Sequence, residues 1–542
     1  MSYPVLVDAL ADSLRLHRAK PAICIEAAGS QETPQLTYGE LDEQSDAVAA
    51  GLEHWGVRPG DHVAILSKPR PEWVSSFLGI LKAGAVAIPI DPLLRKTEIH
   101  RLVSATDAVG IIVSGENYAE VSGLATQELT VVFDLDKTEL ESNGDFLTWE
   151  AFLSEASFTP HGRGPDDLAA MLCTSGTMGD AKSVMLSNAN VTSNVEAVFE
   201  RLVVTSDDLM VTIAPWNHSF GLVVLIAALW KGGTVVYTND YANLAEVTAR
   251  HRATVLVAVP KLFHSMYERL HERIDANRWQ RALKRIAPRL VGRTIRQKLS
   301  GGRLRFFVSG SAPLSPEVAT GYRKLGLGVV EGYGLTETAP VICFSDAFTP
   351  KVGTVGPPLK NVEAKLIHTN EEGIGELLVR GPNVMQGYYK NERRTREILD
   401  EDGWLHTGDL AHIDEDGWIY IKGRRKNVIV LDTGKNVYPE EIEWELLHSP
   451  YIQEIVIRQS KRKGSDVIQA LVYPNRNEVD AELDDDELRA LIWDEIRGRN
   501  RHLATYKRIR SEQDVILVDE PFEKTTLEDV KRYLYQDETG ES

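Results

Sequence analysis

The feature that most constrains the fold is a repeated alternation of short apolar runs with helical patterns. Between residues 61 and 92, the strand-like run DHVAILS is followed by the helix-like run PEWVSSFLGILKAG and by a second strand-like run, AVAIPID. The alternation returns at GIIVS (110–114), MVTIAP (210–215), GTVVYT (233–238), TVLVAVP (254–260) and RFFVSG (305–310). Strands that alternate with helices form parallel sheets covered on both faces. We therefore predict an α/β body.

The pattern changes near residue 350. The run DGWLHTGDLAHIDEDGWIYIKGRRKNVIVL (402–431) joins short strand-like pieces by D-G and E-D-G turns, which predicts a β-rich segment. After GRRKN (423–427) the order is helix, strand, strand, helix, which predicts a compact α+β domain. A chain of 542 residues exceeds what one hydrophobic core usually serves. We predict two domains, residues 1–425 and 426–542.

Charge and cysteine usage narrow the class of partner and the compartment. The chain has 60 basic and 79 acidic residues and a net charge of −19, so its surface repels a phosphate backbone and we predict no nucleic-acid partner. Its three cysteines, Cys24, Cys173 and Cys343, are far apart, which suits free thiols in a reducing compartment. The first twenty residues lack a signal-peptide pattern, and the longest apolar run (221–230) is too short to cross a bilayer. We predict a cytoplasmic protein.

The segment 273–298 differs from the rest of the chain because it is rich in Arg and Lys. Its apolar side chains recur at helical spacing, at Trp279, Leu283, Ile286 and Leu290. A basic amphipathic helix can lie on an anionic membrane surface. The alternative is a solvated helix that packs by one face and is kinked at Pro288. Peripheral membrane contact is therefore one of two interpretations of this segment.

The run TSGTMGDAKS (174–183) comes close to the nucleotide-binding pattern G-x-x-x-x-G-K-[ST], with Ala181 in place of the second glycine. In that pattern the lysine leads directly into a helix, whereas VMLS (184–187) is strand-like and the next helix begins at about residues 187–190. The sequence therefore predicts a strand, a loop and a second strand. Hydroxyl groups, flexible glycines and one ammonium group suit a polyphosphate. A polar turn with an incidental lysine is the alternative.

Together with its flanks, this loop resembles a known family. TSGTMGDAKSVMLSN (174–188) is similar to the phosphate loop of the adenylate-forming superfamily, which includes acyl- and aryl-CoA synthetases, the adenylation domains of peptide synthetases, and luciferases. Further matches follow in the family's order: SGSAPL (309–314) and GYGLTE (332–337) resemble its adenine motifs, GWLHTGD (403–409) its ribose motif, GRRKN (423–427) its interdomain hinge, and GKNVYPEEIE (434–443) the start of its C-terminal domain. The resemblance covers nearly the whole chain.

The resemblance implies a fold and a nucleotide site. The fold is a large N-terminal domain of α/β subdomains with a distorted β-barrel segment, followed by a small, mobile α+β C-terminal domain. The residues implied in holding the phosphates of ATP are Thr174, Ser175, Gly176, Thr177, Gly179 and Lys182. Those implied around the adenine are Gly310, Ser311, Ala312, Gly332, Tyr333 and Gly334, with Tyr333 stacked on the base.

The resemblance also implies roles near the reacting groups. Thr336 would bind a phosphate, and Glu337 would hold Mg²⁺, for which carboxylate oxygens are good ligands. Asp409 would accept hydrogen bonds from both ribose hydroxyls, and Arg424 would contact the ribose or a phosphate. Lys426 would be the hinge, and Gly434 would lie at the start of the mobile domain. His218, in APWNHSFG (214–221), would border the acyl site. The predicted catalytic residues are Thr177, Lys182, His218, Glu337 and Asp529.

Each of these roles has an ordinary structural alternative. GYGLTE could be a glycine-rich turn that caps a helix at Thr336, and Asp409 could be a turn aspartate. Arg424 and Lys426 could belong to a solvated charge patch, and His218 could be a packed core residue.

The sequence departs from the family at one position of particular weight. In PFEKTTLEDVKR (521–532), Asp529 stands where the family has a lysine that meets the α-phosphate during adenylation. Loss of one such stabilising group slows catalysis by about a hundredfold or more. Either Lys524 or Lys531 substitutes for it, or adenylation is slow, or the chain binds an adenylate without turnover.

The predicted activity is the ATP-dependent conversion of a carboxylic acid, of fatty or related type, to an acyl-adenylate and then to a thioester. Coenzyme A is the leading acceptor. An acyl carrier protein or an amine is the alternative acceptor, and a non-catalytic nucleotide-binding protein is the alternative class. ATP and Mg²⁺ are the expected cofactors.

Overall fold

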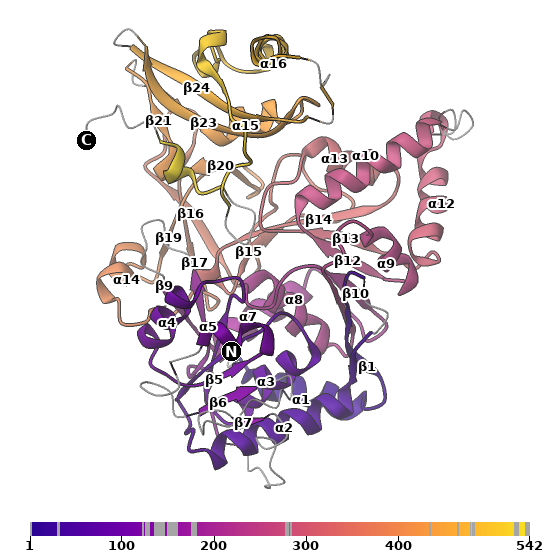
Figure 1. Ribbon diagram of the computed structural model, residues 1–542, viewed down its shortest axis with the longest axis vertical. Helices are drawn as coiled ribbons and strands as arrows, with labels where there is room; N and C mark the ends of the chain where they lie inside the picture. The colour runs from indigo at the N-terminus through magenta and orange to yellow at the C-terminus, as the bar shows by residue number, and fades with distance from the viewer. Residues whose placement is uncertain are drawn as a thin grey trace. The chain divides into compact units, whose positions relative to one another are not determined.

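The structure is a computed structural model that describes residues 3–29, 33–121, 124, 131–134, 147–148, 161–174, 182–276, 281, 284–432, 435–462, 465–476, 478–479, 483–524 and 530–536. The backbone contacts divide the chain into two compact units. Figure 1 shows the chain coloured by residue number. Unit 1 comprises Met1–Ala364 and Val379–Leu405, and unit 2 comprises Lys365–Leu378 and His406–Ser542. The sequence boundary between residues 425 and 426 remains a prediction.

Unit 1 contains two large sheets. In the first, the six central strands are parallel and the two edge strands are antiparallel to their neighbours. Its order is β15 (Val341–Phe344), β14 (Gly328–Gly334), β13 (Phe306–Ser309), β12 (Val255–Ala258), β10 (Leu209–Thr212), β11 (Thr234–Thr238), β1 (Pro21–Glu26) and β2 (Gln35–Thr37). We call this sheet A.

The second sheet of unit 1, sheet B, ends in an antiparallel edge. Its order is β18 (Gly387–Tyr388), β9 (Lys182–Ser187), β8 (Leu168–Thr174), β4 (Val86–Ile90), β3 (His62–Leu66), β5 (Ala108–Val113), β6 (Val131–Asp134) and β7 (Leu147–Thr148). The strands from β8 to β7 are parallel, β9 is antiparallel to β8, and β18 is antiparallel to β9.

Helices follow most strands of both sheets, as the alternating pattern predicts. They are α1 (Leu6–Leu16), α2 (Tyr38–His54), α3 (Pro71–Lys82), α4 (Lys96–Ala105), α5 (Tyr118–Val121), α7 (Asn188–Phe199), α8 (Ser219–Trp230), α9 (Leu244–Arg250), α10 (Pro260–Ala276), α12 (Pro288–Ser300), α13 (Pro316–Lys324) and α14 (Glu392–Ile398). Two 3₁₀ turns are η1 (Gly115–Asn117) and η2 (Thr336–Thr338). The α/β prediction is confirmed.

Unit 2 is rich in strands. Most of one four-stranded sheet belongs to it, in the order β16 (Glu363–Ile367), β17 (Gly375–Arg380), β19 (Leu405–Ile413) and β20 (Ile419–Arg424). The remaining strands are β21 (Ile429–Val430), β22 (Asn436–Val437), β23 (Ile452–Arg462), β24 (Ser465–Pro474) and β25 (Val515–Leu517). The helices are α15 (Pro439–Leu446) and α16 (Asp485–Arg499), with 3₁₀ turns η3 (Arg425–Asn427), η4 (Asn500–His502), η5 (Thr505–Lys507), η6 (Glu512–Asp514) and η7 (Arg532–Tyr535).

One aliphatic core joins the helices and strands after residue 428. Ile442 and Leu446 of α15 and Ile492 and Ile496 of α16 are fully buried against the sheet β23–β24–β25. These side chains recur every three or four residues, so each helix presents one apolar face. The helix–strand–strand–helix pattern predicted after GRRKN is confirmed.

Candidate functional site

The connections of sheet A reverse direction at β10. From β10 the chain passes through α8 to β11 on one side, and it then returns to β12 on the other side of β10. In sheets of this kind, ligands bind outside the carboxyl ends of the strands at such a switch point. The segment with His218 follows β10, Ser311 follows β13, and Tyr333 lies near the carboxyl end of β14. The topology therefore brings three predicted motifs to one edge of sheet A.

The predicted phosphate loop is flanked by a hairpin. Thr174 ends β8 and Lys182 begins β9, and the two residues are antiparallel partners. Ser187 then caps α7 by accepting a hydrogen bond from the backbone N–H of Asn190. The predicted order of strand, loop, strand and capped helix is confirmed, and it differs from the lysine-into-helix order of a P-loop.

Several predicted residues lie outside the described part of the chain. They are Ser175, Gly176, Thr177 and Gly179 of the phosphate loop, together with Gly434 and Asp529. Their roles remain predictions from the resemblance.

Three side chains from distant segments meet beside this hairpin. Tyr388, on the edge strand β18, is buried and donates a hydrogen bond of 2.7 Å from its hydroxyl to Oε1 of Glu337. The Nζ of Lys182 lies 5.0 Å from the centroid of the Tyr388 ring, a cation–π arrangement. We call Lys182, Tyr388 and Glu337 the charged cluster. In this cluster an ammonium group lies over the ring of one tyrosine, and a carboxylate accepts from the hydroxyl of the same tyrosine.

The charges of this cluster are not neutralised by neighbours. Among the described residues, no carboxylate forms an ion pair with Lys182, and no Lys or Arg forms one with Glu337. Burial and the nearby Glu337 charge raise the pKa of Tyr388, so its hydroxyl stays protonated and donates. The cluster can therefore offer its ammonium to an anion and its carboxylate to a cation.

A second contact links this cluster to the motif after β10. The hydroxyls of Thr336 and Ser219 are 3.4 Å apart, which connects η2 to the first residue of α8. Phe220 follows Ser219, and its ring packs on Gly310: an added Cβ there would lie 2.8 Å from the ring. Contacts therefore run from Lys182 to Gly310, the start of the predicted adenine loop.

His218 precedes this contact. Burial lowers the pKa of the His218 imidazole, and the nearby carboxylate of Asp91 only partly opposes this effect. Because the ordinary pKa of histidine is about 6.5, the ring is neutral at pH 7. A neutral ring can accept or donate a hydrogen bond without adding a positive charge beside Ser219.

The two glycines around Tyr333 differ in what surrounds them. A Cβ at Gly334 would lie 1.8 Å from the carbonyl oxygen of Pro340, whereas a Cβ at Gly332 would contact nothing within 4 Å. Packing therefore requires glycine at position 334, and it does not require glycine at position 332. Thr336 and Glu337 lie in the short 3₁₀ turn η2, which begins at Thr336, so the phosphate and magnesium roles and the alternative of a glycine-rich turn that caps a helix both remain predictions.

The predicted ribose residues form their own cluster in unit 2. Asp409 is 3% exposed on β19 and lies opposite Arg424 on β20, with Nε of Arg424 2.9 Å from Oδ1 of Asp409. Asp409 is therefore in a strand, and the turn alternative is wrong. Arg425 likewise pairs with the buried Glu376 at 2.6 Å. Lys426 is exposed and lies in η3, between Arg425 and Asn427.

Two lysines near Asp529 already have carboxylate partners. Nζ of Lys524 is 2.5 Å from Glu454, and Nζ of Lys531 is 3.5 Å from Glu523. Lys524 also pairs through its backbone with Val530, at the base of the segment that contains Asp529. Lys524 is thus tied to the strand β23, and this ion pair opposes its use as a substitute for the missing lysine.

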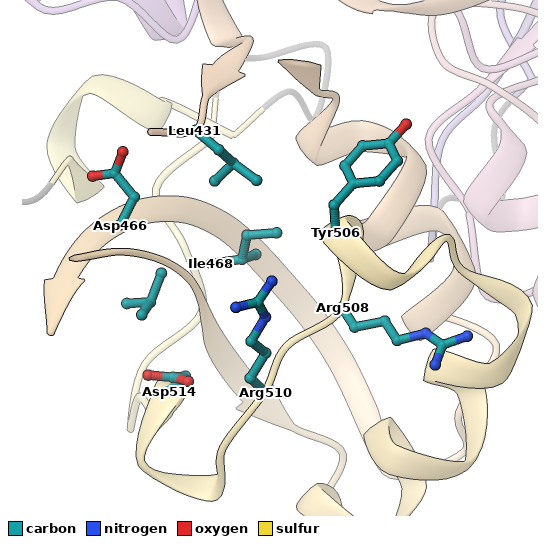
Figure 2. A pocket seen from close by; sticks show the side chains of 8 residues that line it. Leu431, Asp466, Ile468, Tyr506, Arg508, Arg510 and Asp514 are labelled. Carbon is teal, nitrogen blue, oxygen red and sulfur yellow. The ribbon is translucent and has the colours of Figure 1, made fainter. Parts of the chain in front are cut away.

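A separate pocket lies within unit 2. Its empty space is about 260 Å³, and its lining includes Leu431, Asp466, Tyr506, Arg510 and Asp514 (Figure 2). None of the predicted site residues lines this pocket, so it is a poor candidate for a nucleotide.

Comparison with known families decides the identity of the fold. The family model described as "AMP-binding enzyme" matches residues 10–389, and the model described as "AMP-binding enzyme C-terminal domain" matches residues 426–538. The chain belongs to the AMP-binding enzyme family. The adenylate-forming resemblance is therefore confirmed.

The relatives of this AMP-binding enzyme act on different acids. It is 32% identical over 451 residues to long chain acyl-CoA synthetase 6, peroxisomal, of Arabidopsis thaliana, with 75% of this chain and 64% of the plant protein covered. The chain thus spans less than two thirds of that relative's length. It is 31% identical over 475 residues to feruloyl-CoA synthase of Amycolatopsis sp, with 85% and 88% covered. The family includes acid–CoA ligases.

A solved structure with a nucleotide bound shares the fold of this chain. ATP bound MatB from Rhodopseudomonas palustris is 27% identical, with a TM-score of 0.78 and 98% of each chain covered. The AMP-binding enzyme described here thus shares its fold with a protein that binds ATP. Across the described residues, no helix has the length and apolar character needed to cross a bilayer.

Tyr388 is the site residue that the sequence did not single out. It lies in GYY (387–389), two residues of which form the short strand β18 against β9. A two-residue strand carries no periodic pattern, and its partner lies far away in the sequence. The one signal for this residue in the sequence is a tyrosine directly after a glycine, in the run GYY.

Proposed function

We propose that the chain is an AMP-forming acid–CoA ligase. A carboxylate oxygen of the acid attacks the α-phosphorus of ATP, and the bond to pyrophosphate breaks to give an acyl-adenylate. The thiolate of coenzyme A then attacks the acyl carbon and AMP leaves. The names of the relatives support coenzyme A as the acceptor. The observation that carries this proposal is the charged cluster of Lys182, Tyr388 and Glu337.

The charges of the cluster suit the first half-reaction. The pyrophosphate that leaves gains negative charge, and a fixed ammonium group stabilises that charge in the transition state. We assign this role to Lys182, with Thr174, Ser175, Gly176, Thr177 and Gly179 holding the phosphates. Tyr388 keeps Glu337 oriented through its hydrogen bond, so the carboxylate needs no reorganisation during the reaction.

The residues fit a magnesium ion that arrives with ATP. Among the described residues, no group of three or more His, Cys, Asp or Glu could hold a metal by itself. Mg²⁺ usually takes one or two protein carboxylates and completes its shell with water and substrate phosphates. Glu337 supplies one such carboxylate. The ion would neutralise part of the triphosphate charge.

The remaining predicted residues complete the proposal. Tyr333 stacks on the adenine beside Gly310, Ser311, Ala312, Gly332 and Gly334, and Thr336 binds a phosphate. Asp409 and Arg424 contact the ribose, and His218 borders the carboxylate of the acid. We propose an acid of fatty or related type, which the name of the plant relative supports, and the name of the feruloyl-CoA synthase supports an aromatic acid as a second option.

Asp529 favours one rival class, a protein that binds an acyl-adenylate without turnover. Acid-dependent exchange of pyrophosphate into ATP separates the two classes. A panel of fatty and aromatic acids is incubated with enzyme, Mg·ATP and labelled pyrophosphate, and AMP release is then measured with and without coenzyme A. A ligase exchanges label with at least one acid and releases more AMP when coenzyme A is added. If none of the acids supports exchange, the chain is instead a protein that binds an acyl-adenylate without turnover.

The same assay tests the charged cluster. Lys182→Ala removes the ammonium group, and loss of one transition-state donor of this kind slows catalysis by about a hundredfold. Glu337→Ala should raise the Mg²⁺ concentration needed for half-maximal exchange. Unchanged kinetics in either variant would remove that residue from the site.

A further inference from the structure

The helix α12 is held firmly on the periphery of unit 1, next to α9 (Figure 1). Val291 and Ile295 are buried in the core of sheet A, and a Cβ at Gly292 would lie 1.6 Å from the carbonyl oxygen of Leu325. The side chain of Arg296 also donates to the carbonyl of Gly326. One face of α12 is thus fixed to the protein, so the opposite face always points to solvent.

This outer face is basic. Arg289, Arg293 and Lys298 on α12 are exposed, and so is Arg285 just before it. Among the described residues, no carboxylate forms an ion pair with any of these four cations. Lys284, by contrast, pairs with Asp275, which is the one carboxylate within residues 273–298 of the sequence. Arg289 and Arg293 lie one turn apart on the outer face of α12, and Arg285 comes just before the helix, whereas Lys298 lies farther round it. Among the described residues, these three arginines therefore form a cluster of cations without ion-pair partners, in a chain whose net charge is −19.

The basic face also exposes aliphatic side chains. Ile286 is 84% exposed and Leu290 is 47% exposed, each directly after an exposed arginine. Transfer of such side chains from water to an apolar phase is favourable, and here two of them lie next to a cluster of cations. The break that the sequence predicts at Pro288 is present, since Ala287 has φ −142° and α12 begins at Pro288, whereas Trp279 and Leu283 lie outside the described residues.

We propose that this face, formed by Arg285, Ile286, Arg289, Leu290 and Arg293, docks on the surface of an anionic phospholipid bilayer. In interfacial helices, cations contact the headgroup phosphates and aliphatic side chains enter the acyl boundary. The rest of the acidic surface is repelled by the same membrane, so the field orients the protein with α12 toward it. The proposal is independent of which acid the enzyme activates.

The aliphatic side chains favour a bilayer over the other anionic partners. A nucleic acid or an acidic carrier protein would satisfy the arginines, but Ile286 and Leu290 would remain in water against phosphates or carboxylates. A bilayer alone provides both an anionic layer and an apolar layer within the depth of a side chain.

The test measures sedimentation of the full-length protein with vesicles of phosphatidylcholine alone or mixed with phosphatidylglycerol. Wild type is expected to bind the mixed vesicles selectively and to be released at ~1 M salt, where the screening length falls to about 3 Å. In the variant Arg285→Gln/Arg289→Gln/Arg293→Gln, partitioning should fall about a hundredfold, since each basic residue near such a surface contributes about fivefold. Ile286→Ser/Leu290→Ser should weaken binding yet keep the preference for phosphatidylglycerol.

A matched control removes the same charge from another helix of unit 1. Arg393→Gln/Arg394→Gln/Arg396→Gln changes three exposed arginines of α14, each paired with Glu397 or Glu392, and should bind vesicles as wild type does. Thermal melting verifies that each variant folds. If the arginine variant does not fold, the Ile286→Ser/Leu290→Ser variant still tests whether this face binds vesicles. Equal binding to both vesicle types would overturn the proposal. So would equal loss in the α14 control, or binding to an RNA oligonucleotide or an acidic carrier protein without binding to vesicles.

Discussion

At the scale of single residues, Tyr388 joins the two charged groups of the candidate site. Its hydroxyl donates to Glu337 and its ring faces Lys182, so one side chain fixes the distance between an ammonium group and a carboxylate. Its own position is fixed in turn, because its backbone N–H donates to the hydroxyl of Thr395 at 2.9 Å. We regard Tyr388 as a positioning residue for Glu337.

This role predicts a specific defect in Tyr388→Phe. A hydrogen bond to a charged group contributes about 1.5–3 kcal/mol, so kcat/KM for Mg·ATP should fall about tenfold or more. The Mg²⁺ concentration needed for half-maximal exchange should rise, because Glu337 loses its fixed orientation. Steady-state exchange measured across a Mg²⁺ series checks both effects.

The neighbouring tyrosine supplies the control for this experiment. The hydroxyl of Tyr389 donates to Asp107 at 2.6 Å, away from Glu337, so Tyr389→Phe should leave the Mg²⁺ dependence unchanged. If the two variants lose activity equally and neither shifts the Mg²⁺ requirement, Tyr388 has a structural role only.

Asp529 is the residue at which the sequence departs furthest from its family. A carboxylate near the α-phosphate opposes the attack of a second carboxylate, and a lysine stabilises it. Asp529→Lys should therefore raise acid-dependent exchange by on the order of a hundredfold. Capture of a preformed acyl-adenylate by coenzyme A should change little, because the resemblance implies that the C-terminal domain has then turned and presents other groups to the nucleotide.

Glu528→Lys makes the same change of charge one residue earlier. A general electrostatic effect on ATP binding would raise exchange in both variants. A gain confined to position 529 supports the alignment of this segment, whereas a loss there would show that the alignment is wrong.

At the scale of secondary-structure elements, the turn after β14 positions Thr336 and Glu337. Gly334 is pressed against the carbonyl of Pro340, and the backbone N–H of Leu335 donates to the same carbonyl at 3.0 Å. The turn therefore has no room for a side chain at 334. The placement of Glu337 depends on this close approach of two backbone segments.

The paired substitutions Gly334→Ala and Gly332→Ala separate folding from nucleotide binding. Gly334→Ala should lower the free energy of unfolding by about 1–3 kcal/mol, because the backbone must move to admit the methyl group. Gly332→Ala should leave stability almost unchanged, since the methyl group meets nothing within 4 Å. If Gly332 borders the adenine, the second variant still binds ATP more weakly. Chemical denaturation and ATP titration of both variants measure the two effects separately.

The elements that the sequence predicted are those with a local signal. The runs DHVAILS and AVAIPID form β3 and β4, because alternating apolar character and turn residues specify a strand without reference to distant partners. The order of sheet A has no such signal: β10 lies between β11 and β12 only because the connections cross. For the same reason the meeting of Lys182 with Tyr388 and of Thr336 with Ser219 could not be predicted. Each contact joins segments far apart in the chain. The first depends on the pairing of β18 with β9 in sheet B, and neither two-residue β18 nor the turn η2 carries a periodic pattern.

At the scale of the whole molecule, two half-reactions must use one bound adenylate. The resemblance implies that the C-terminal domain turns about Lys426 between them, so that different groups face the nucleotide in each step. The backbone around this residue suits a hinge. Strands β20 and β21 are separated by the single 3₁₀ turn η3, while Arg425 and Asn427 on either side are anchored to Glu376 and Glu440.

A proline at the hinge should therefore separate the two half-reactions. Lys426→Pro restricts φ at one residue to about −65° and disfavours helical torsions at Arg425. Whichever half-reaction needs the restricted conformation should slow by about tenfold, the effect of ~1.4 kcal/mol on its barrier, while the other is retained. Pyrophosphate exchange reports the first half-reaction, and thioester formation from a preformed adenylate reports the second.

Lys426→Ala distinguishes the backbone from the side chain at this position. Alanine removes the ammonium group but leaves the torsions free, so both half-reactions should continue if Lys426 acts as a hinge. Equal defects in the two variants would mean that the side chain itself contacts a reacting group. A rigid two-domain enzyme would lose both half-reactions together or neither. The ratio of the two half-reaction rates should therefore differ between Lys426→Pro and Lys426→Ala if the domain turns about this residue.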